Sequence, residues 1–558
     1  MIRTRYSRAS PASTRKERSS VASFSLGRAS AILASGTIVS RFLGFVMSIA
    51  FTQTIGLIGQ GADAFTIANG LPNTVYSIIA GGALNAVLVP QIVRAGLHAD
   101  GGRTYINRLL TLTFVVLLVA TIVAIFFAPL LVAVNAAHYG PAQFQLAVAF
   151  AYWCLPQVFF YGLYTILGEV LNARGSFGPF TWTPVLNNIV TLVGLGVFHA
   201  LFGADGSGER PAENWTPAMI AVLAGSATLG VALQAVVLVF FWKRVGLSYR
   251  PDFRLRGVGL GHAGRIAGWT FATLLLTVIA GFIENTTVSA ASGQNASATT
   301  LQKAWLVFML PHSVIAVSLA TAYFTRMSGH ATAGRMNELR SDISDNIRVV
   351  GLFLVPASGA LIALSGNFST IFASSPTPVN LDMSVIISVY AMVLPLFSVL
   401  AIVQRAFYSL NDGKTPFFYT LVQVIFIIIG CIAVQHASNT ISALLVAIVV
   451  SLGIALQSII ACLLLRHRLG RRGGWRIIMR FTQYTVAALP AFGAGFSVNV
   501  FTLFIQDSLY SLPGIITSII SMVITVTIMA LVYFSILWLF RVPELYSLFG
   551  PLLPSRVR

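Results

Sequence analysis

Two matching stretches decide the fold: Leu229-Gly230-Val231-Ala232-Leu233-Gln234 and Leu452-Gly453-Ile454-Ala455-Leu456-Gln457, which lie 223 residues apart. A second pair, Leu71-Pro72-Asn73-Thr74-Val75 and Leu310-Pro311-His312-Ser313-Val314, lies 239 residues apart, so the chain contains an internal repeat. Both copies of the first motif belong to long apolar segments that end in basic residues. The copies therefore point the same way, which predicts two parallel lobes related by a pseudo-two-fold axis along the membrane normal.

The composition indicates a membrane protein. Of the 558 residues, 56% are hydrophobic and 9% are charged, and the mean hydropathy is +0.83. Soluble domains carry about 25% charged residues, so a soluble enzyme is all but excluded. The net charge of +19 does not indicate nucleic acid binding, because the basic residues lie between apolar segments. The three cysteines lie singly in apolar runs, which excludes a disulfide framework and a CxxC metal site.

Fourteen apolar segments are long enough to cross a bilayer, which takes about 20 helical residues. They lie near residues 31–54, 64–90, 109–134, 143–168, 178–202, 217–242, 266–284, 302–325, 349–365, 383–404, 416–436, 441–465, 481–503 and 512–540. All but three of the 35 Lys and Arg residues fall in alternate connecting segments, which predicts that both termini are cytoplasmic. The predicted fold class is all-α: a polytopic integral membrane protein with about 14 transmembrane helices, in two six-helix lobes plus two C-terminal helices.

This pattern divides the chain into five predicted parts. They are a basic disordered cytoplasmic tail (1–28), an N-lobe (29–245), a C-lobe (246–468), two further helices (469–541) and a cytoplasmic C-terminal tail (542–558). The first part is rich in Arg and Ser, so a mitochondrial transit peptide is an alternative. We favour a tail that contacts anionic membrane lipids.

Arg41 is a candidate substrate-binding residue. It lies about ten residues into the first segment, roughly 15 Å deep at 1.5 Å per residue. An Arg at mid-bilayer costs about 2.5–3.5 kcal/mol on insertion scales, so it is expected to face a polar interior. Its guanidinium donates paired hydrogen bonds to phosphate, which suggests an anion site. The structural alternative is an Arg that caps carbonyl groups at a helix break.

Three further ionisable residues lie at the outer ends of predicted spans. Lys303 is a candidate second positive charge for the substrate, and Glu284 is a candidate proton or cation site for ion coupling. The alternative for both is an interfacial ion pair or snorkelling side chains. For Asp63 we favour an N-terminal cap of its own helix, with gating as the second possibility.

Pro72 and Pro311 interrupt apolar segments at matching positions of the two repeats, and paired helix breaks point to a substrate site. Asn73 and His312 follow these prolines and are candidate substrate-binding residues. For a lone His in a membrane helix, hydrogen-bonded packing is the more common role.

No motif indicates an enzyme. Asp412-Gly413-Lys414-Thr415 resembles the end of a Walker A loop, but Tyr408 occupies the position of the required first Gly. The sequence contains no HExxH, no GxSxG and no large domain outside the membrane. We therefore predict no catalytic residues, no metal and no cofactor.

Several motifs together resemble the MurJ (MviN) family of lipid II flippases. They are 35–45 (SGTIVSRFLGF), 62–65 (ADAF), 71–73 (LPN), 81–91 (GGALNAVLVPQ), 153–162 (WCLPQVFFYG) and 308–313 (FMLPHS). The last three look especially like the actinobacterial branch. Arg41 matches the family's Arg in S-R-x-L-G-F, and Asp63 matches its Asp in D-A-F.

The resemblance implies the fold of multidrug and oligosaccharide-lipid exporters. It also implies a positively charged cavity, lined by spans one, two, seven and eight, and an alternating-access cycle. Tyr76 and Ser77 stand where many members have two Arg, and Leu306 lies about where a cavity Arg would fall, so fewer charges are expected here. Lys303, three residues before Leu306, is a candidate replacement.

The predicted function is translocation of lipid II, the undecaprenyl-pyrophosphate-linked peptidoglycan precursor, across a bacterial plasma membrane. One alternative is export of another lipid-linked glycan or of small cationic drugs. A second alternative is a non-transporting scaffold of the wall-synthesis machinery. A third and weaker alternative is an integral-membrane glycosyltransferase. The expected partners are lipid II and membrane lipids. Peptidoglycan synthases and division proteins are further candidate partners, and no nucleic acid partner is expected.

Overall fold

The computed structural model describes residues 35–81, 103–174, 176–244, 249–253, 264–373, 378–470, 474–509 and 514–549. Every regular element in these ranges is helical. The N-terminal ones are Ser35–Ile55, α2 (Gln60–Ile79), α4 (Arg103–Phe126), α5 (Ala128–Asn135), α6 (Pro141–Cys154), α7 (Gln157–Ala173), α8 (Phe177–Phe202), η2 (Ala212–Asn214) and α9 (Pro217–Arg244). The later ones are α10 (Gly264–Ser289), α11 (Ala298–Pro311), η3 (His312–Ala316), α12 (Val317–Thr332), α13 (Met336–Ala363), α14 (Ser365–Phe372), α15 (Pro378–Ser409), α16 (Lys414–Val434), α17 (Ser442–Leu469), α18 (Gly474–Leu509), α19 (Gly514–Leu539) and α20 (Pro543–Phe549).

The described part of the chain contains 13 helical segments that are long and apolar enough to cross a membrane. Each coincides with one of the fourteen predicted spans, which confirms an all-α, multi-pass membrane protein. The remaining prediction, 64–90, corresponds to α2, which is helical from Gln60 to Ile79. The rest of that span and the tail at 1–28 lie outside the described residues.

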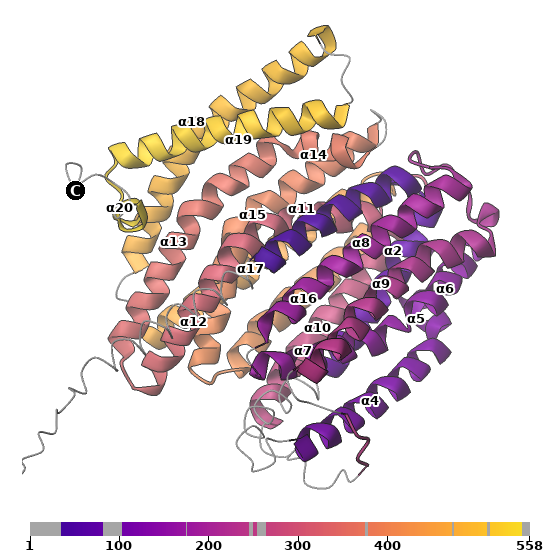
Figure 1. Cartoon of the computed structure of the whole chain (residues 1–558). Coiled ribbons are helices and arrows are strands. Elements are labelled where there is room, and N and C mark those ends of the chain that lie inside the picture. Colours follow the sequence, from indigo (N-terminus) through magenta and orange to yellow (C-terminus); the bar gives the residue numbers. More distant parts are fainter. Residues whose placement is uncertain are drawn as a thin grey trace, which may run out of the picture.

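The helices form two neighbouring bundles. Helices within 35–244, the N-terminal bundle, pack around apolar side chains such as Phe150, Phe198 and Leu167. Helices within 264–470, the C-terminal bundle, pack around a larger apolar core, which also takes in Leu57 and Ile67 of the first bundle. In Figure 1 the first bundle is indigo to magenta and the second is pink to orange.

Helices α18 and α19 pack side by side along α13, at the edge of the C-terminal bundle (Figure 1). The Tyr533 hydroxyl of α19 donates a hydrogen bond to the Leu352 carbonyl of α13 at 2.8 Å. Behind them, the buried carboxylate of Glu544 in α20 contacts Arg348 of α13 at 2.5 Å and Arg480 of α18 at 3.5 Å. These contacts fix the C-terminal helices to the bundle.

The sequence repeat corresponds to equivalent helix packing. A Cβ atom at Gly230 of α9 would overlap Asn187 of α8, and one at Gly453 of α17 would lie 3.1 Å from Ile427 of α16. The glycine of each repeated motif therefore allows its helix to approach the preceding helix closely. Gln457, from the same motif, donates a hydrogen bond to the Thr420 hydroxyl of α16 at 2.8 Å.

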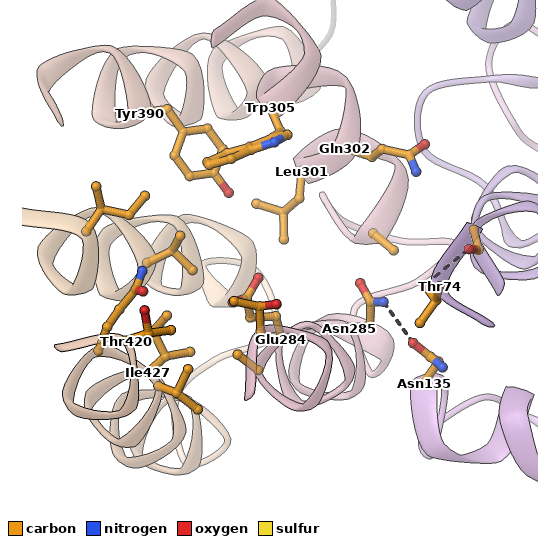
Figure 2. A pocket seen from close by; sticks show the side chains of 18 of the residues that line it. Thr74, Asn135, Glu284, Asn285, Leu301, Gln302, Trp305, Tyr390, Thr420 and Ile427 are labelled. Carbon is orange, nitrogen blue, oxygen red and sulfur yellow. Dashed lines mark hydrogen bonds between the residues drawn. The ribbon is translucent and has the colours of Figure 1, made fainter. Parts of the chain in front are cut away.

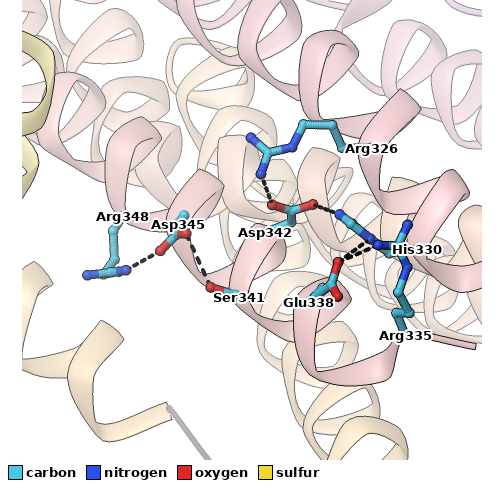
Figure 3. Close-up of polar contacts among 8 residues, drawn as sticks. All are labelled: Arg326, His330, Arg335, Glu338, Ser341, Asp342, Asp345 and Arg348. Atoms are coloured by element: carbon cyan, nitrogen blue, oxygen red, sulfur yellow. Dashed lines mark hydrogen bonds and ion pairs between the residues drawn. The ribbon is translucent and has the colours of Figure 1, made fainter.

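The turn between α12 and α13 carries a network of ion pairs (Figure 3). Asp342 contacts Arg326 at 2.6 Å, while His330 lies 2.8 Å from Glu338 and 3.3 Å from Asp342. Arg335 joins the same Glu338 at 3.0 Å. This turn lies on the side to which the Lys and Arg distribution assigns the cytoplasm.

Candidate functional site

A cavity of about 600 Å³ lies between the two bundles. Its walls come from α2 of the N-terminal bundle and from α10, α11, α15, α16 and α17 of the C-terminal bundle. Figure 2 shows side chains from these helices converging on one space. At its edge, Asn285 of α10 donates a hydrogen bond to Asn135 of α5 at 2.9 Å, which joins the two bundles.

The described cavity lining mixes apolar side chains with amides and hydroxyls and is almost uncharged. Its amide and hydroxyl groups include Asn73, Thr74, Thr273, Thr277, Gln302, Gln404, Thr420, Gln423 and Gln457. Among the described residues, Glu284 is the one lining residue with a formal charge. The resemblance implied a positively charged cavity, and this space differs because neither Arg41 nor Lys303 is among the residues that line it.

Glu284 lies on α10 and faces the cavity, and Thr420 of the neighbouring helix α16 lies close by in the same view (Figure 2). No ion pair joins Glu284 to Lys303 or to another basic residue in the described ranges. The ion pair with Lys303, one of the two structural alternatives for these residues, is therefore not formed. An acidic side chain that faces amides and hydroxyls, rather than a fixed cation, leaves its oxygens available to a proton or a small cation.

Asp63 connects the two bundles at the end of the cavity that the charge distribution assigns to the outer face. One oxygen of its carboxylate accepts a hydrogen bond from the Thr299 backbone N–H at 2.9 Å, and the other accepts one from the Ser292 hydroxyl at 2.6 Å. The Thr66 and Thr299 hydroxyls add a contact of 2.9 Å. The predicted cap of its own helix is wrong, since no side chain caps α2; Asp63 caps α11 of the other bundle instead.

Other contacts close the same end. The Gln143 side chain of α6 donates to the Ser292 hydroxyl at 2.7 Å, and the Thr286 hydroxyl of α10 donates to the Val134 carbonyl at 2.6 Å. His138 lies 3.1 Å from the Ser289 hydroxyl through its Nδ1 atom. Polar groups of the N-terminal bundle thus meet α10 and the segment before α11 along one continuous outer seam.

Helix α2 carries two predicted site residues. Asn73 is exposed and lines the cavity, as expected for a substrate-facing residue. Pro72 does not break the helix, because α2 continues through it to Ile79, and this prediction is wrong. A proline inside a membrane helix is tolerated where neighbouring groups satisfy the backbone.

Pro311 does alter its helix. Helix α11 ends there, and a π-helical turn, His312–Ala316, leads into α12. His312 is only 4% exposed, its Nδ1 atom lies 2.9 Å from the Ser398 hydroxyl, and its ring packs 4.5 Å from that of Phe397. The expectation that His312 lines the cavity is therefore wrong in this conformation, and hydrogen-bonded packing is its role.

Arg41 is exposed on the first helix and has no acidic partner among the described residues. It interacts electrostatically with His312, and so does Arg405 of α15. Arg405 also donates a hydrogen bond to the Thr321 hydroxyl of α12 at 2.8 Å. Two guanidinium groups, one from each bundle, therefore lie near His312, away from the outer seam.

Lys303 lies on α11, beside the cavity-lining residues Leu301 and Gln302. Its ammonium group sits 4.6 Å from the centre of the Phe51 ring in the first helix. This cation–π contact holds the charge in the interface between the bundles rather than in the cavity.

Sequence reasoning missed most of the neutral lining. Gln404, Gln423 and Gln457 are amides within otherwise apolar spans, and Gln457 belongs to the repeated motif itself. A search for amides in the spans, rather than for charges alone, finds them. Within the described residues, no group of three or more His, Cys, Asp or Glu side chains is placed to hold a metal.

These observations define a class of protein: a multi-pass membrane transporter in which two helical bundles enclose a polar cavity that is closed at one end. Solved structures support the class at the level of fold. One titled "Lipid II flippase MurJ, inward closed conformation" aligns with a TM-score of 0.70 at 19% identity, covering 91% of this chain and 98% of that one. An inward-facing multidrug resistance MATE family transporter of the MOP superfamily aligns with a TM-score of 0.61 at 16% identity, covering 77% and 94%.

The sequence identifies the family within this class. The family model described as "Lipid II flippase MurJ" matches residues 51–541, so the chain belongs to the MurJ family of bacterial membrane proteins. It is similar to the probable lipid II flippase MurJ of Rhizobium tropici, with 26% identity over 444 residues and 76% of each chain covered. The probable lipid II flippase MurJ of Rickettsia prowazekii is 25% identical over 418 residues, covering 72% of this chain and 76% of that one.

Proposed function

We propose that this chain carries lipid II from the inner to the outer leaflet of the bacterial membrane by alternating access. The family match over residues 51–541 is the observation that carries the proposal. The arrangement of the two bundles agrees with it, because the polar contacts between them gather at the outer end of the cavity. In the proposed cycle this outer seam opens after the lipid headgroup has entered from the inner side.

Arg41 is the residue we assign to the pyrophosphate. It is exposed and has no acidic partner in the described ranges, so its paired donors are free to bind phosphate oxygens. Arg405 supplies a second cation from the other bundle. A pyrophosphate between the two would draw the bundles together, while Asn73 and the lining glutamines bind the sugar-peptide headgroup.

Asp63 is the proposed outer gate. Its carboxylate holds Thr299 and Ser292 of the other bundle through two hydrogen bonds, both of which must break when the outer end opens. Lys303 on Phe51 is a second contact that separates in the same step.

Glu284 is the proposed coupling residue, because it is the one formal charge on the cavity lining. Moving one elementary charge across the membrane potential is worth about 2.3 kcal/mol per 100 mV, enough to bias a two-state cycle. The same observation favours a second candidate function, export of small organic cations, which an acidic cavity would attract.

The proposal includes an orientation and a place of action. Both termini are assigned to the cytoplasm, because the basic connecting segments lie on that side. Peptidoglycan synthases and division proteins are the proposed downstream partners, since they use the precursor at the outer leaflet.

Complementation tests the proposal. A bacterium depleted of its own lipid II flippase would receive wild type, Arg41→Ala or Arg250→Ala, the last a control at an exposed arginine. Lipid II in the outer leaflet is then quantified at matched membrane levels. We expect rescue by wild type and Arg250→Ala but not by Arg41→Ala. A wild type that reaches the membrane and restores no outer lipid II, while a known flippase does, contradicts the proposal. Resistance to cationic dyes in that case supports the second candidate.

A further inference from the structure

A second cavity, of about 690 Å³, lies outside the space between the bundles. Its walls come from α13, α15, α17 and α18. We call it the α17–α18 cleft, since those two helices supply most of its lining. None of the candidate residues for substrate binding, gating or ion coupling lines it. It therefore needs an explanation of its own.

The interior of the cleft presents almost only apolar surface. Residues such as Leu396, Ile459 and Phe481 line it. Two of its hydroxyl groups bond to backbone carbonyls: Ser458 donates to the Ile454 carbonyl at 2.7 Å, and Thr485 donates to the Phe481 carbonyl at 2.9 Å. These two hydroxyl groups need no water molecule as a partner. Protein interiors rarely keep voids of this size unfilled. A hydrocarbon chain from the surrounding bilayer is the chemically matched occupant.

One end of the cleft is basic. Arg340 and Arg466 line it, and no acidic residue does so among the described residues. The guanidinium group of Arg340 lies close to Gly470, because a Cβ atom added at Gly470 would be 3.7 Å from a terminal nitrogen of Arg340. Arg466 lies close to Gly474 in the same way, because a Cβ atom added at Gly474 would be 4.0 Å from the Nε atom of Arg466. Both guanidinium groups thus flank the short connection between α17 and α18, and neither forms an ion pair with a described residue.

Arg340 is also only partly satisfied. Its terminal Nη1 donates to Asn337 at 3.2 Å, but its Nε–H is fully buried and has no hydrogen-bond partner. A buried, unpaired donor on a charged group is costly, whereas a phosphate oxygen would satisfy it. The arginine therefore points to an anionic ligand at the mouth of the cleft.

The dimensions match one leaflet. Along α18 the lining runs from Gly474 to Val486, which is roughly 18 Å of helix at 1.5 Å per residue. The hydrocarbon core of a bilayer is about 30 Å thick, so the cleft covers about half of it, starting from the basic end. That end lies on the side assigned to the cytoplasm, where anionic lipids attract basic residues.

We propose that the α17–α18 cleft binds a resident anionic phospholipid of the cytoplasmic leaflet. Its phosphate is held by Arg340 and Arg466, and its acyl chains fill the apolar interior. The occupant is a two-chain membrane lipid and not the polyprenyl chain of the transported substrate, because the cleft shares no lining residue with the cavity between the bundles and covers only one leaflet. The inference does not depend on which cargo the chain carries.

Native mass spectrometry of the purified full-length chain tests this inference. Detergent-solubilised protein is titrated with phosphatidylglycerol, with phosphatidylcholine and with a polyprenyl phosphate. The variants are the double substitution Arg340→Gln with Arg466→Gln, which removes the charges but keeps the cleft, and Thr485→Phe, which fills the cleft but keeps the charges. Arg476→Gln is the matched control, since it removes an exposed arginine of α18 that does not line the cleft.

Wild type and Arg476→Gln should retain phosphatidylglycerol in preference to phosphatidylcholine. The double variant should bind it roughly thirtyfold more weakly, since each basic residue near an anionic lipid contributes about fivefold. Thr485→Phe should lose the same lipid while its secondary structure remains intact by circular dichroism. Equal retention of both phospholipids, unchanged binding in the double variant or preferential loading of polyprenyl phosphate would overturn the assignment.

Discussion

The carboxylate of Asp63 accepts the backbone N–H of Thr299 at 2.9 Å, although 236 residues separate the two in the chain. Asp63 is 1% exposed and belongs to α2, while Thr299 lies in the first turn of α11. A carboxylate at a helix N-terminus is stabilised by unpaired N–H groups and by the helix dipole. One bundle therefore caps a helix of the other, and this contact must break for the outer end to open.

Asp63→Ala should weaken the outer seam. The substitution removes two hydrogen bonds to a charged group, each worth about 1.5–3 kcal/mol. A cysteine introduced at Thr66, which is buried at the seam, should then react faster with a membrane-impermeant thiol reagent added outside. Asp205→Ala is the control, because the Asp205 carboxylate accepts hydrogen bonds from Glu209 and Arg210 of its own loop. Equal reactivity in both variants would argue against a gate at Asp63.

Glu284→Gln should uncouple transport from its driving gradient. The substitution keeps the shape of the side chain but removes the one formal charge from the cavity lining. We expect outer-leaflet lipid II to lose its response to ionophores that collapse the proton or sodium gradient. Glu213→Gln, at an exposed outer position, should keep the wild-type response. A Glu284→Gln variant that still responds fully would place coupling elsewhere.

Gly194→Ala should destabilise the N-terminal bundle, whereas Gly196→Ala should not. Both glycines lie on α8, but a Cβ atom at Gly194 would overlap Ser226 of α9, and one at Gly196 meets nothing within 4 Å. Overpacking of this kind costs about 1–3 kcal/mol. Thermal unfolding of the purified chain should therefore show a lower midpoint for Gly194→Ala alone. Similar midpoints for the two variants would contradict the close α8–α9 contact.

Glu544→Gln should loosen the C-terminal helices. Its buried carboxylate contacts Arg348 and Arg480, and breaking a buried ion pair costs about 3 kcal/mol or more. We expect easier proteolysis near α20 and a lower unfolding midpoint. Glu338→Gln removes a half-exposed acid from the α12–α13 turn and should cost much less. Comparable losses in the two variants would show that burial of Glu544 does not determine its contribution.

The fold could be predicted largely from hydropathy and the repeat, because a bilayer forces each span to be a long apolar helix. Pro72 shows the limit of that reasoning. The helix-breaking tendency of proline predicts an interruption there, but α2 runs through Pro72 to Ile79. Whether a proline interrupts a membrane helix depends on tertiary contacts that a single segment does not reveal.

The site was less predictable, because its contacts are long-range. Asp63 and Glu284 could be selected from the sequence because ionisable residues are rare in membrane spans. The residues that contact them could not be selected in this way. Asp63 bonds to a backbone group 236 residues away, and no side-chain pattern marks that partner. His312 was singled out in the same way and proved to be packed against Ser398. For Asp63 and His312 the sequence marks an unusual residue, and the structure shows which group it contacts.

The most direct test is a translocation assay with the purified chain in liposomes that carry fluorescent lipid II. Reagent added outside bleaches only lipid exposed at the outer leaflet. Wild type should make the inner-leaflet pool accessible at a rate proportional to protein, and Arg41→Ala should be slower by tenfold or more, as expected for the loss of a charge-assisted bidentate contact. Liposomes with wild type that protect lipid II as well as protein-free liposomes do would contradict the proposed function.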